Sequence, residues 1–168
     1  GIFPWFEDDE PILWWSPPER MVLFLEDVKI SKSMRNIIYQ QKFKVTFNTA
    51  FREVILNCKK ISRKNQTGTW ITDNMVEAYF KLHELGIAKS VEVWENEELV
   101  GGLYGVDLGH VFCGESMFSK VPNASKVAFI HLAKQLELAN YKLLDCQVHN
   151  NHLESLGCIE IEREEFLE

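Results

Sequence analysis

Strand and helix signals in the second half of the chain follow one another in an order that narrows the fold to few possibilities. Apolar runs of strand length at residues 90–94 and 99–106 flank a polar turn at 95–98, which predicts a β-hairpin. A third strand is expected over 110–118 and runs into a loop. A long helix then begins at Asn123, because apolar residues recur on one of its faces.

Two further strands and a short helix are expected before the chain ends. The strands are predicted over 142–148 and 159–161, and the short helix over 150–156. The resulting order β-β-β-α-β-α-β is typical of a mixed sheet with helices packed on it. We therefore predict an α+β fold for this part of the chain.

The first 85 residues predict a smaller α+β part with a different character. Residues 1–19 hold three of the five tryptophans and four of the five prolines. We expect a loop there, because proline removes a backbone donor and fixes φ. The elements expected after it are a strand over 21–25, a basic helix over 31–39 with Ser31 as its N-cap, a strand over 42–48, a helix over 49–58, a loop over 65–68 and a helix that Asp73 caps and Gly86 ends.

Charge is distributed unevenly along the chain. Residues 28–65 contain ten basic residues and one acid, so this segment contributes +9 to a net charge of −7 and the rest of the chain carries −16. A basic segment of this kind is typical of a surface that binds a polyanion such as nucleic acid. The alternative is a helix face that is basic and merely solvated.

The cysteines and the apolar runs bear on the compartment. The four cysteines are widely spaced and form no Cys-x-x-Cys pair, which favours reduced thiols in a cytosolic protein over a disulfide framework. No apolar run approaches the roughly 20 residues of a membrane helix, and there is no signal-peptide pattern. A His-x-x-His pair, His149 and His152, lacks a third ligand, so we predict no metal site.

Nine short motifs stand in order along essentially the whole chain. They are GIFPWF at 1–6, ILWWSP at 12–17, GTWIT at 68–72, LHELG at 82–86, GGLYGV at 101–106, FCGESMFS at 112–119, NASK at 123–126, DCQ at 145–147 and HLESLG at 152–157. As an ordered set they resemble the leucyl/phenylalanyl-tRNA–protein transferases, bacterial cytosolic enzymes of the N-end-rule pathway. Compared with that family, we expect the chain to be short at both termini.

The resemblance implies a reaction, partners and a domain division. Leucine or phenylalanine would move from its charged tRNA to the α-amine of a protein that begins with Arg or Lys, making a peptide bond. The resemblance also implies an N-terminal aromatic and basic region on the tRNA side over 1–85. An acetyltransferase-like (GNAT) catalytic domain is implied over 86–168. The enzyme is expected to be a cytoplasmic monomer.

No cofactor is expected, although the implied fold is acetyltransferase-like. A coenzyme A pyrophosphate loop would need glycines at the strand-to-helix junction before Asn123. That junction reads FSKVP at 118–122 and contains no glycine. The residues themselves therefore disfavour coenzyme A.

Three residues are implied as the catalytic set. Asp145 and Gln147 stand two apart on an expected strand, so their side chains can face the same site. In the relay proposed for the family, Asp145 orients or polarises Gln147, and Gln147 contacts the attacking amine. Glu115 is expected on a neighbouring loop, where its carboxylate could accept hydrogen bonds from the aminoacyl ammonium or the ribose hydroxyls. Taken alone, Asp145 would be an ordinary carboxylate at a strand end.

Selection of Leu or Phe over β-branched residues calls for an apolar pocket that is narrow at Cβ and deeper beyond. Methionine suits such a pocket because it adapts its shape to either side chain. The positions that match the family's pocket are Leu103, Phe112, Met117, Leu132 and Leu144. Taken one by one, each of the five is more typical of an ordinary core residue.

The tRNA is expected to meet aromatic and basic side chains. Trp5 and Trp70 resemble the family's aromatic walls near the terminal adenosine, where base stacking contributes about 1–3 kcal/mol. The acidic run at 7–10 is a candidate for attracting the cationic N-terminus of the acceptor protein, or else a solvated loop. The residues expected to contact tRNA phosphates are Lys29, Lys32, Arg35, Lys42, Lys59, Lys60 and Arg63.

Two other functions stay open at this point. The chain could be a relative that binds tRNA without catalysis, which would bind but never transfer. It could also be an aminoacyl-tRNA-dependent transferase that acts on a cell-wall peptide amine.

Overall fold

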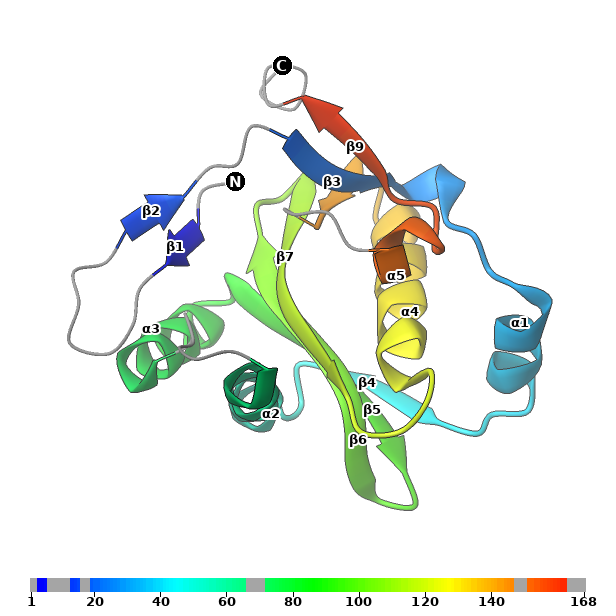
Figure 1. Cartoon of the computed structure of the whole chain (residues 1–168), viewed down its shortest axis with the longest axis horizontal. Helices are drawn as coiled ribbons and strands as arrows, with labels where there is room; N and C mark the ends of the chain where they lie inside the picture. Colours follow the sequence, from blue (N-terminus) through cyan, green and yellow to red (C-terminus); the bar gives the residue numbers. More distant parts are fainter. Residues whose placement is uncertain (1–2, 6–12, 16–18, 66–71, 147–150, 163–168) are drawn as a thin grey trace.

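A seven-stranded mixed sheet runs through the middle of the molecule (Figure 1). The structure is a computed structural model that describes residues 3–5, 13–15, 19–65, 72–146 and 151–162. The strands lie in the order β4 (Lys44–Phe47), β5 (Ala88–Glu95), β6 (Glu98–Asp107), β7 (Val111–Ser119), β8 (Leu143–Asp145), β3 (Glu19–Phe24) and β9 (Ile159–Glu162). Only β7 and β8 pair in parallel; the other neighbouring pairs of this sheet are antiparallel.

Helices cover both faces of the sheet. One face carries α2 (Phe51–Asn65) and α3 (Asp73–Glu84), and the other carries α4 (Ala124–Leu138) with α1 (Lys32–Tyr39) outside it (Figure 1). Each face has its own buried cluster, one built around Phe129 and Leu144 under α4 and one around Val54 and Tyr104 under α2. The short helix α5 (Asn151–Glu154) contributes Leu153 to the cluster under α4, and a 3-10 turn η1 (Leu25–Asp27) follows β3.

The predicted α+β class and the order of elements from β5 to β9 are confirmed. The hairpin between β5 and β6 turns at Asn96 and Glu97, which both have positive φ, of 51° and 68°. A two-residue turn of this kind matches the right-handed twist of the strands. Ser31 caps α1 as predicted, because its Oγ accepts a hydrogen bond from Met34 N at 3.2 Å.

Strands from before residue 86 complete this sheet. β4 pairs with β5 at one edge, and β3 lies between β8 and β9 at the other. Figure 1 shows both strands within the same layer as β5 to β9. The first part of the chain is therefore built into the sheet of the second part.

Two local predictions are wrong. Residues 1–19 are not all loop, because β1 (Phe3–Trp5) and β2 (Leu13–Trp15) pair antiparallel as a separate two-stranded ribbon. Proline is tolerated there because both strands of such a ribbon are edge strands. The cap of α3 is Thr72 rather than Asp73: Thr72 Oγ1 accepts a hydrogen bond from Met75 N at 3.2 Å, which makes Asp73 the first helical residue.

The pairing of β6 with β7 contains a β-bulge. Tyr104 pairs with Ser116 and Gly105 pairs with Gly114, so Glu115 is the extra residue on β7. Our expectation of a loop at Glu115 was therefore wrong, because the residue lies inside a strand. Bulges bend a strand and redirect a side chain, and they are frequent next to active sites.

Because Gly105 has no side chain, the backbone of β7 can approach β6 closely at this bulge. A Cβ added at Gly105 would lie 2.3 Å from the Cys113 carbonyl oxygen and 2.5 Å from the Phe112 ring. A Cβ added at its partner Gly114 would meet only the Asp145 carbonyl oxygen, at 3.5 Å, which is ordinary contact. The two glycines of one pair thus differ in how much they tolerate a side chain.

We expect Gly105→Ala to lower the free energy of unfolding by about 1–3 kcal/mol, because β6 and β7 must shift to relieve the contact. Gly114→Ala should stay within about 1 kcal/mol of the parent, since a new methyl group fits and the unfolded chain loses freedom. Urea unfolding of both variants measures the difference. Equal stability of the two would contradict this account of the bulge.

Candidate functional site

A cavity opens where β7 and β8 separate. Among the described residues, the two strands pair over Val111–Cys113 and Leu143–Asp145, and β7 then continues to Ser119. The cavity has a volume of about 240 Å³ on the side of α4. Its lining comes from β6, β7, α4, β8 with the residue after it, and α5: Leu103, Gly114, Glu115, Ser116, Met117, Phe129, Leu132, Leu144, Cys146 and Leu153.

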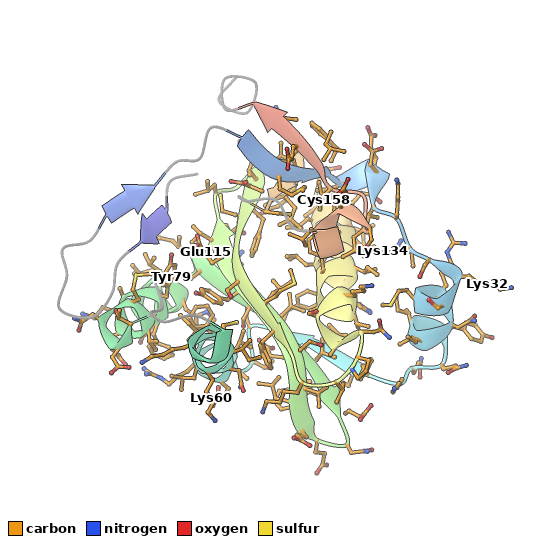
Figure 2. All side chains as sticks on the ribbon, viewed as in Figure 1. Lys32, Lys60, Tyr79, Glu115, Lys134 and Cys158 are labelled. Carbon is orange, nitrogen blue, oxygen red and sulfur yellow. The ribbon has the colours of Figure 1, made fainter. Side chains whose placement is uncertain are left out.

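The bulge places Glu115 at this cavity. Glu115 also meets Tyr79 of α3, whose hydroxyl donates a hydrogen bond to the carboxylate. Figure 2 labels the two residues on neighbouring elements, Glu115 on β7 and Tyr79 on α3. Burial, the Glu115 charge and this hydrogen bond raise the pKa of Tyr79, in that order. The phenol therefore stays protonated and keeps its donor for Glu115.

More polar side chains lie near Glu115 and Tyr79, on the sheet face next to α2. Ser116 follows the bulge and hydrogen-bonds with Cys58 of α2, whose thiol pKa burial raises to about 12. Tyr104 lies beside them with its ring edge toward Tyr79, at 5.5 Å between ring centroids. Burial raises the pKa of Tyr104 as well, so this face holds neutral phenols and a neutral thiol around one carboxylate.

Asp145 ends β8 at the point where the strands separate. Its side chain is fully buried, and the Cys113 thiol donates to its Oδ2 at 3.8 Å. Asp145 pairs with Val22 on one side and with Cys113 on the other, so β3 and β7 fix its backbone. Gln147 lies outside the described residues, and its predicted approach to Asp145 stays a prediction.

Four of the five predicted pocket residues line this cavity. They come from three strands and one helix: Leu103, Met117, Leu132 and Leu144. Phe112 does not line it; its ring is buried and borders a second cavity of about 310 Å³, together with Leu132. Phe112 and Leu144 are register partners on β7 and β8, so their side chains lie on the same face of the sheet.

Several lining residues were not predicted from the sequence. Phe129 could have been found, because it stands three residues before Leu132 and so shares a helix face with it. Gly114, Ser116, Cys146 and Leu153 carry no such signal, because a bulge, the end of a strand and the short helix α5 place them.

The aromatic residues expected at the tRNA end are only partly described. Trp5 lies in β1, paired with Leu13 of β2, and only its backbone is described. Trp70 and the acidic run at 7–10 lie outside the described residues. Their roles therefore stay predictions.

The structure divides the predicted phosphate-binding residues between two faces. Lys29, Lys32, Arg35 and Lys42 are exposed on α1 or next to it, on the side of α4. Lys60 is exposed on α2, across the sheet, and Figure 2 shows Lys32 and Lys60 on opposite sides of the molecule. These cations therefore cannot form a single patch.

Two further cations of the predicted set lie on α2. Lys59 is buried, and its ammonium pairs with the Asp73 carboxylate. For Arg63 only the helical backbone is described. Lys59 is thus already engaged within the protein.

The described part of the chain carries neither a metal cluster nor a helix that could span a membrane. No group of three or more His, Cys, Asp or Glu side chains is placed there to hold a metal ion. None of the helices described is both long and apolar enough to cross a bilayer.

Solved structures of similar shape share only the fold. FemX superposes with a TM-score of 0.64 at 10% identity, over 96% of this chain and 63% of that one. A conserved protein of unknown function from Bacteroides thetaiotaomicron gives 0.62 at 13%, over 83% and 54%. This similarity confirms the predicted acetyltransferase-like sheet.

Sequence comparison gives a much closer relationship. The family described as leucyl/phenylalanyl-tRNA protein transferase matches residues 22–168, and its N-terminal domain matches 1–18. The leucyl/phenylalanyl-tRNA–protein transferase of Flavobacterium johnsoniae is 68% identical over 99% of this chain and 79% of its own length. That of Flavobacterium psychrophilum is 66% identical with the same coverage. The chain therefore belongs to the leucyl/phenylalanyl-tRNA–protein transferase family.

Proposed function

We propose that this chain transfers leucine or phenylalanine from a charged tRNA to the α-amine of a protein that begins with Arg or Lys. The observation that carries the proposal is the cavity where β7 and β8 separate, with its apolar wall and one carboxylate from the bulge. The family assignment supports the same reaction.

The size of the cavity favours one amino-acid side chain as its occupant. Sites for drug-sized ligands and cofactors measure about 300–1,000 Å³, and this one has about 240 Å³. Leu103, Leu132 and Leu144 offer no hydrogen bond, so a polar side chain would lose its partners on entry. Met117 can adapt to a branched or an aromatic side chain.

Glu115 supplies the opposite charge for the aminoacyl ammonium. The backbone at the bulge and the Tyr79 hydroxyl hold its carboxylate at the cavity. An ammonium bound there would place the aminoacyl side chain against the apolar wall. A charge-assisted hydrogen bond of this type contributes about 1.5–3 kcal/mol.

The chemical step needs a neutral amine, orientation and a path for one proton. The acceptor nitrogen attacks the ester carbonyl carbon, the bond from that carbon to the ribose oxygen breaks, and the proton lost by the amine ends on the ribose oxygen. We assign Gln147 to contact the amine and Asp145 to orient Gln147. Orientation contributes up to about 7–11 kcal/mol, and a proton acceptor accelerates such a step by roughly 10²–10⁴-fold.

The tRNA phosphates are assigned to the α1 side. Among the described residues, Lys29, Lys32, Arg35 and Lys42 have exposed side chains, and no acid follows between Val28 and Arg52. On α2, by contrast, Arg52 pairs with Glu77 at 2.7 Å and Lys59 pairs with Asp73. Trp5 and Trp70 are assigned to the terminal adenosine. The acceptor specificity for Arg or Lys, a monomeric state and a cytoplasmic location belong to the same proposal.

Transfer of radiolabelled leucine from Leu-tRNA tests the proposal. A protein that begins with Arg should be labelled, and the same protein beginning with Ala should not. Gln147→Ala should abolish the labelling while tRNA binding persists. Binding of tRNA without labelling of either acceptor would overturn the transferase assignment in favour of a non-catalytic tRNA-binding protein.

We expect Glu115→Gln to lower kcat/KM for Leu-tRNA by roughly tenfold to a hundredfold, because a neutral amide cannot pair with the aminoacyl ammonium. Tyr79→Phe serves as the control: it keeps the ring and the Glu115 carboxylate but removes one hydrogen bond, so its effect on kcat/KM should be smaller. Steady-state transfer to one protein that begins with Arg measures kcat/KM for both variants. A parent-like Glu115→Gln enzyme would exclude Glu115 from substrate binding.

A double variant, Lys32→Ala with Arg35→Ala, should weaken tRNA binding and reduce the slope of log K against log[salt] by about 2, one for each lost phosphate contact. Lys60→Ala on the opposite face of the sheet should leave both quantities unchanged. Filter binding of uncharged tRNA over a salt series gives the slopes. Should Lys60→Ala weaken binding as strongly as the double variant, the phosphates would lie along α2 as well.

A further inference from the structure

Two cysteines enclose the segment that completes the site. Cys146 directly follows Asp145, and Cys158 directly precedes β9. Their sulfur atoms are 3.6 Å apart and share a hydrogen bond across a sequence separation of 12 residues. The intervening segment carries α5 and Gln147, which we assign to the chemical step.

The two thiols differ in access. Cys146 lines the candidate cavity and is half-buried, whereas Cys158 is 2% exposed and packs in the core under α4. Figure 2 labels Cys158 beside α5, near the start of β9. An oxidant that enters the cavity therefore meets Cys146 first, with a second thiol directly behind it.

We propose that Cys146 and Cys158 are a redox modification site, which closes to a reversible disulfide and lowers transfer while it is closed. The sulfurs would approach from 3.6 Å to the roughly 2.0 Å of a disulfide bond. The cavity is lined by both Cys146 and Leu153 of α5, so this approach changes its wall. The effect on transfer rests on the proposed function; the disulfide itself does not.

The chemistry balances with hydrogen peroxide, an oxidant small enough to enter the cavity. The Cys146 thiolate attacks one oxygen of the peroxide, the O–O bond breaks, a sulfenic acid forms on Cys146 and hydroxide leaves. Cys158 then attacks the Cys146 sulfur, the protein disulfide forms and water leaves. The two protein thiols lose two electrons and two protons, and the peroxide becomes two molecules of water.

Both thiols of the pair are free in this structure. The hydrogen bond that the Cys146 thiol makes with Cys158 and burial, followed by the charges of Cys158 and Asp145, raise the pKa of the Cys146 thiol. The thiol is therefore neutral near pH 7 and reacts slowly without added oxidant. A neutral thiol also suits a cavity whose other walls are largely apolar.

Oxidation should slow transfer because the segment after Cys146 must hold its position. A misplacement of about 1 Å can cost a hundredfold in rate, and the closure moves two sulfurs by a similar distance in total. We therefore expect oxidation to lower the rate of leucine transfer by a factor of about ten or more. Dithiothreitol should restore the initial rate of transfer, because it reduces the Cys146–Cys158 disulfide to two thiols.

The test combines thiol mapping with transfer. The full chain is incubated with hydrogen peroxide, its remaining thiols are alkylated after denaturation, and peptides are identified by mass spectrometry. Two of the four thiols should be lost, joined as a Cys146–Cys158 peptide. The Cys58→Ala variant lacks a buried thiol of the cluster under α2 and should still form the Cys146–Cys158 disulfide. Cys158→Ala should instead accumulate a sulfenic acid on Cys146, which dimedone traps.

Three results would overturn the proposal. They are four alkylated thiols after oxidation, a disulfide between other cysteines, and a Cys146–Cys158 disulfide that leaves the transfer rate unchanged. If the reduced protein already transfers nothing, the proposed function fails, and thiol mapping alone then decides whether the pair is a redox site.

Discussion

The separation of β7 from β8 is the feature on which the rest of the site depends. The parallel pairing ends at Cys113 and Asp145, and the bulge at Glu115 begins directly beyond it. Had the two strands stayed paired, ladder hydrogen bonds and side chains would fill the space that the cavity occupies. Gly105 permits the bulge, because a Cβ there would clash with the Cys113 carbonyl oxygen and the Phe112 ring. One irregularity in a sheet thus creates both the apolar wall and its single carboxylate.

The two faces of the sheet hold different parts of the site. The α4 face supplies the apolar wall, with Phe129 and Leu132 on one helix. The face covered by α2 and α3 supplies Tyr79, which hydrogen-bonds to the Glu115 carboxylate. Because Glu115 is the extra residue of a bulge, it reaches the cavity and also Tyr79 on the other face. A regular strand would give each side chain to one face only.

Much of the fold could be predicted from periodicity, whereas the details of the site could not. The order of elements from β5 to β9 and the cap at Ser31 follow from local patterns. The bulge at Glu115 could not be predicted, because register is set by pairing between strands that are distant in sequence. The same holds for Lys59, which looked like a phosphate contact until α3 brought Asp73 beside it. The resemblance to a family located Leu103, Met117 and Leu144; Phe112, on the neighbouring cavity, depends on packing that no linear motif contains.

We propose that the space between β7 and β8 holds the transferred amino acid. A crystal structure with the hydrolysis-resistant 3′-amide of leucyl-adenosine would locate that amino acid. We expect the leucyl side chain against Leu103, Met117 and Leu132, with its ammonium on the Glu115 carboxylate. A leucyl group bound elsewhere, with this cavity empty, would contradict it.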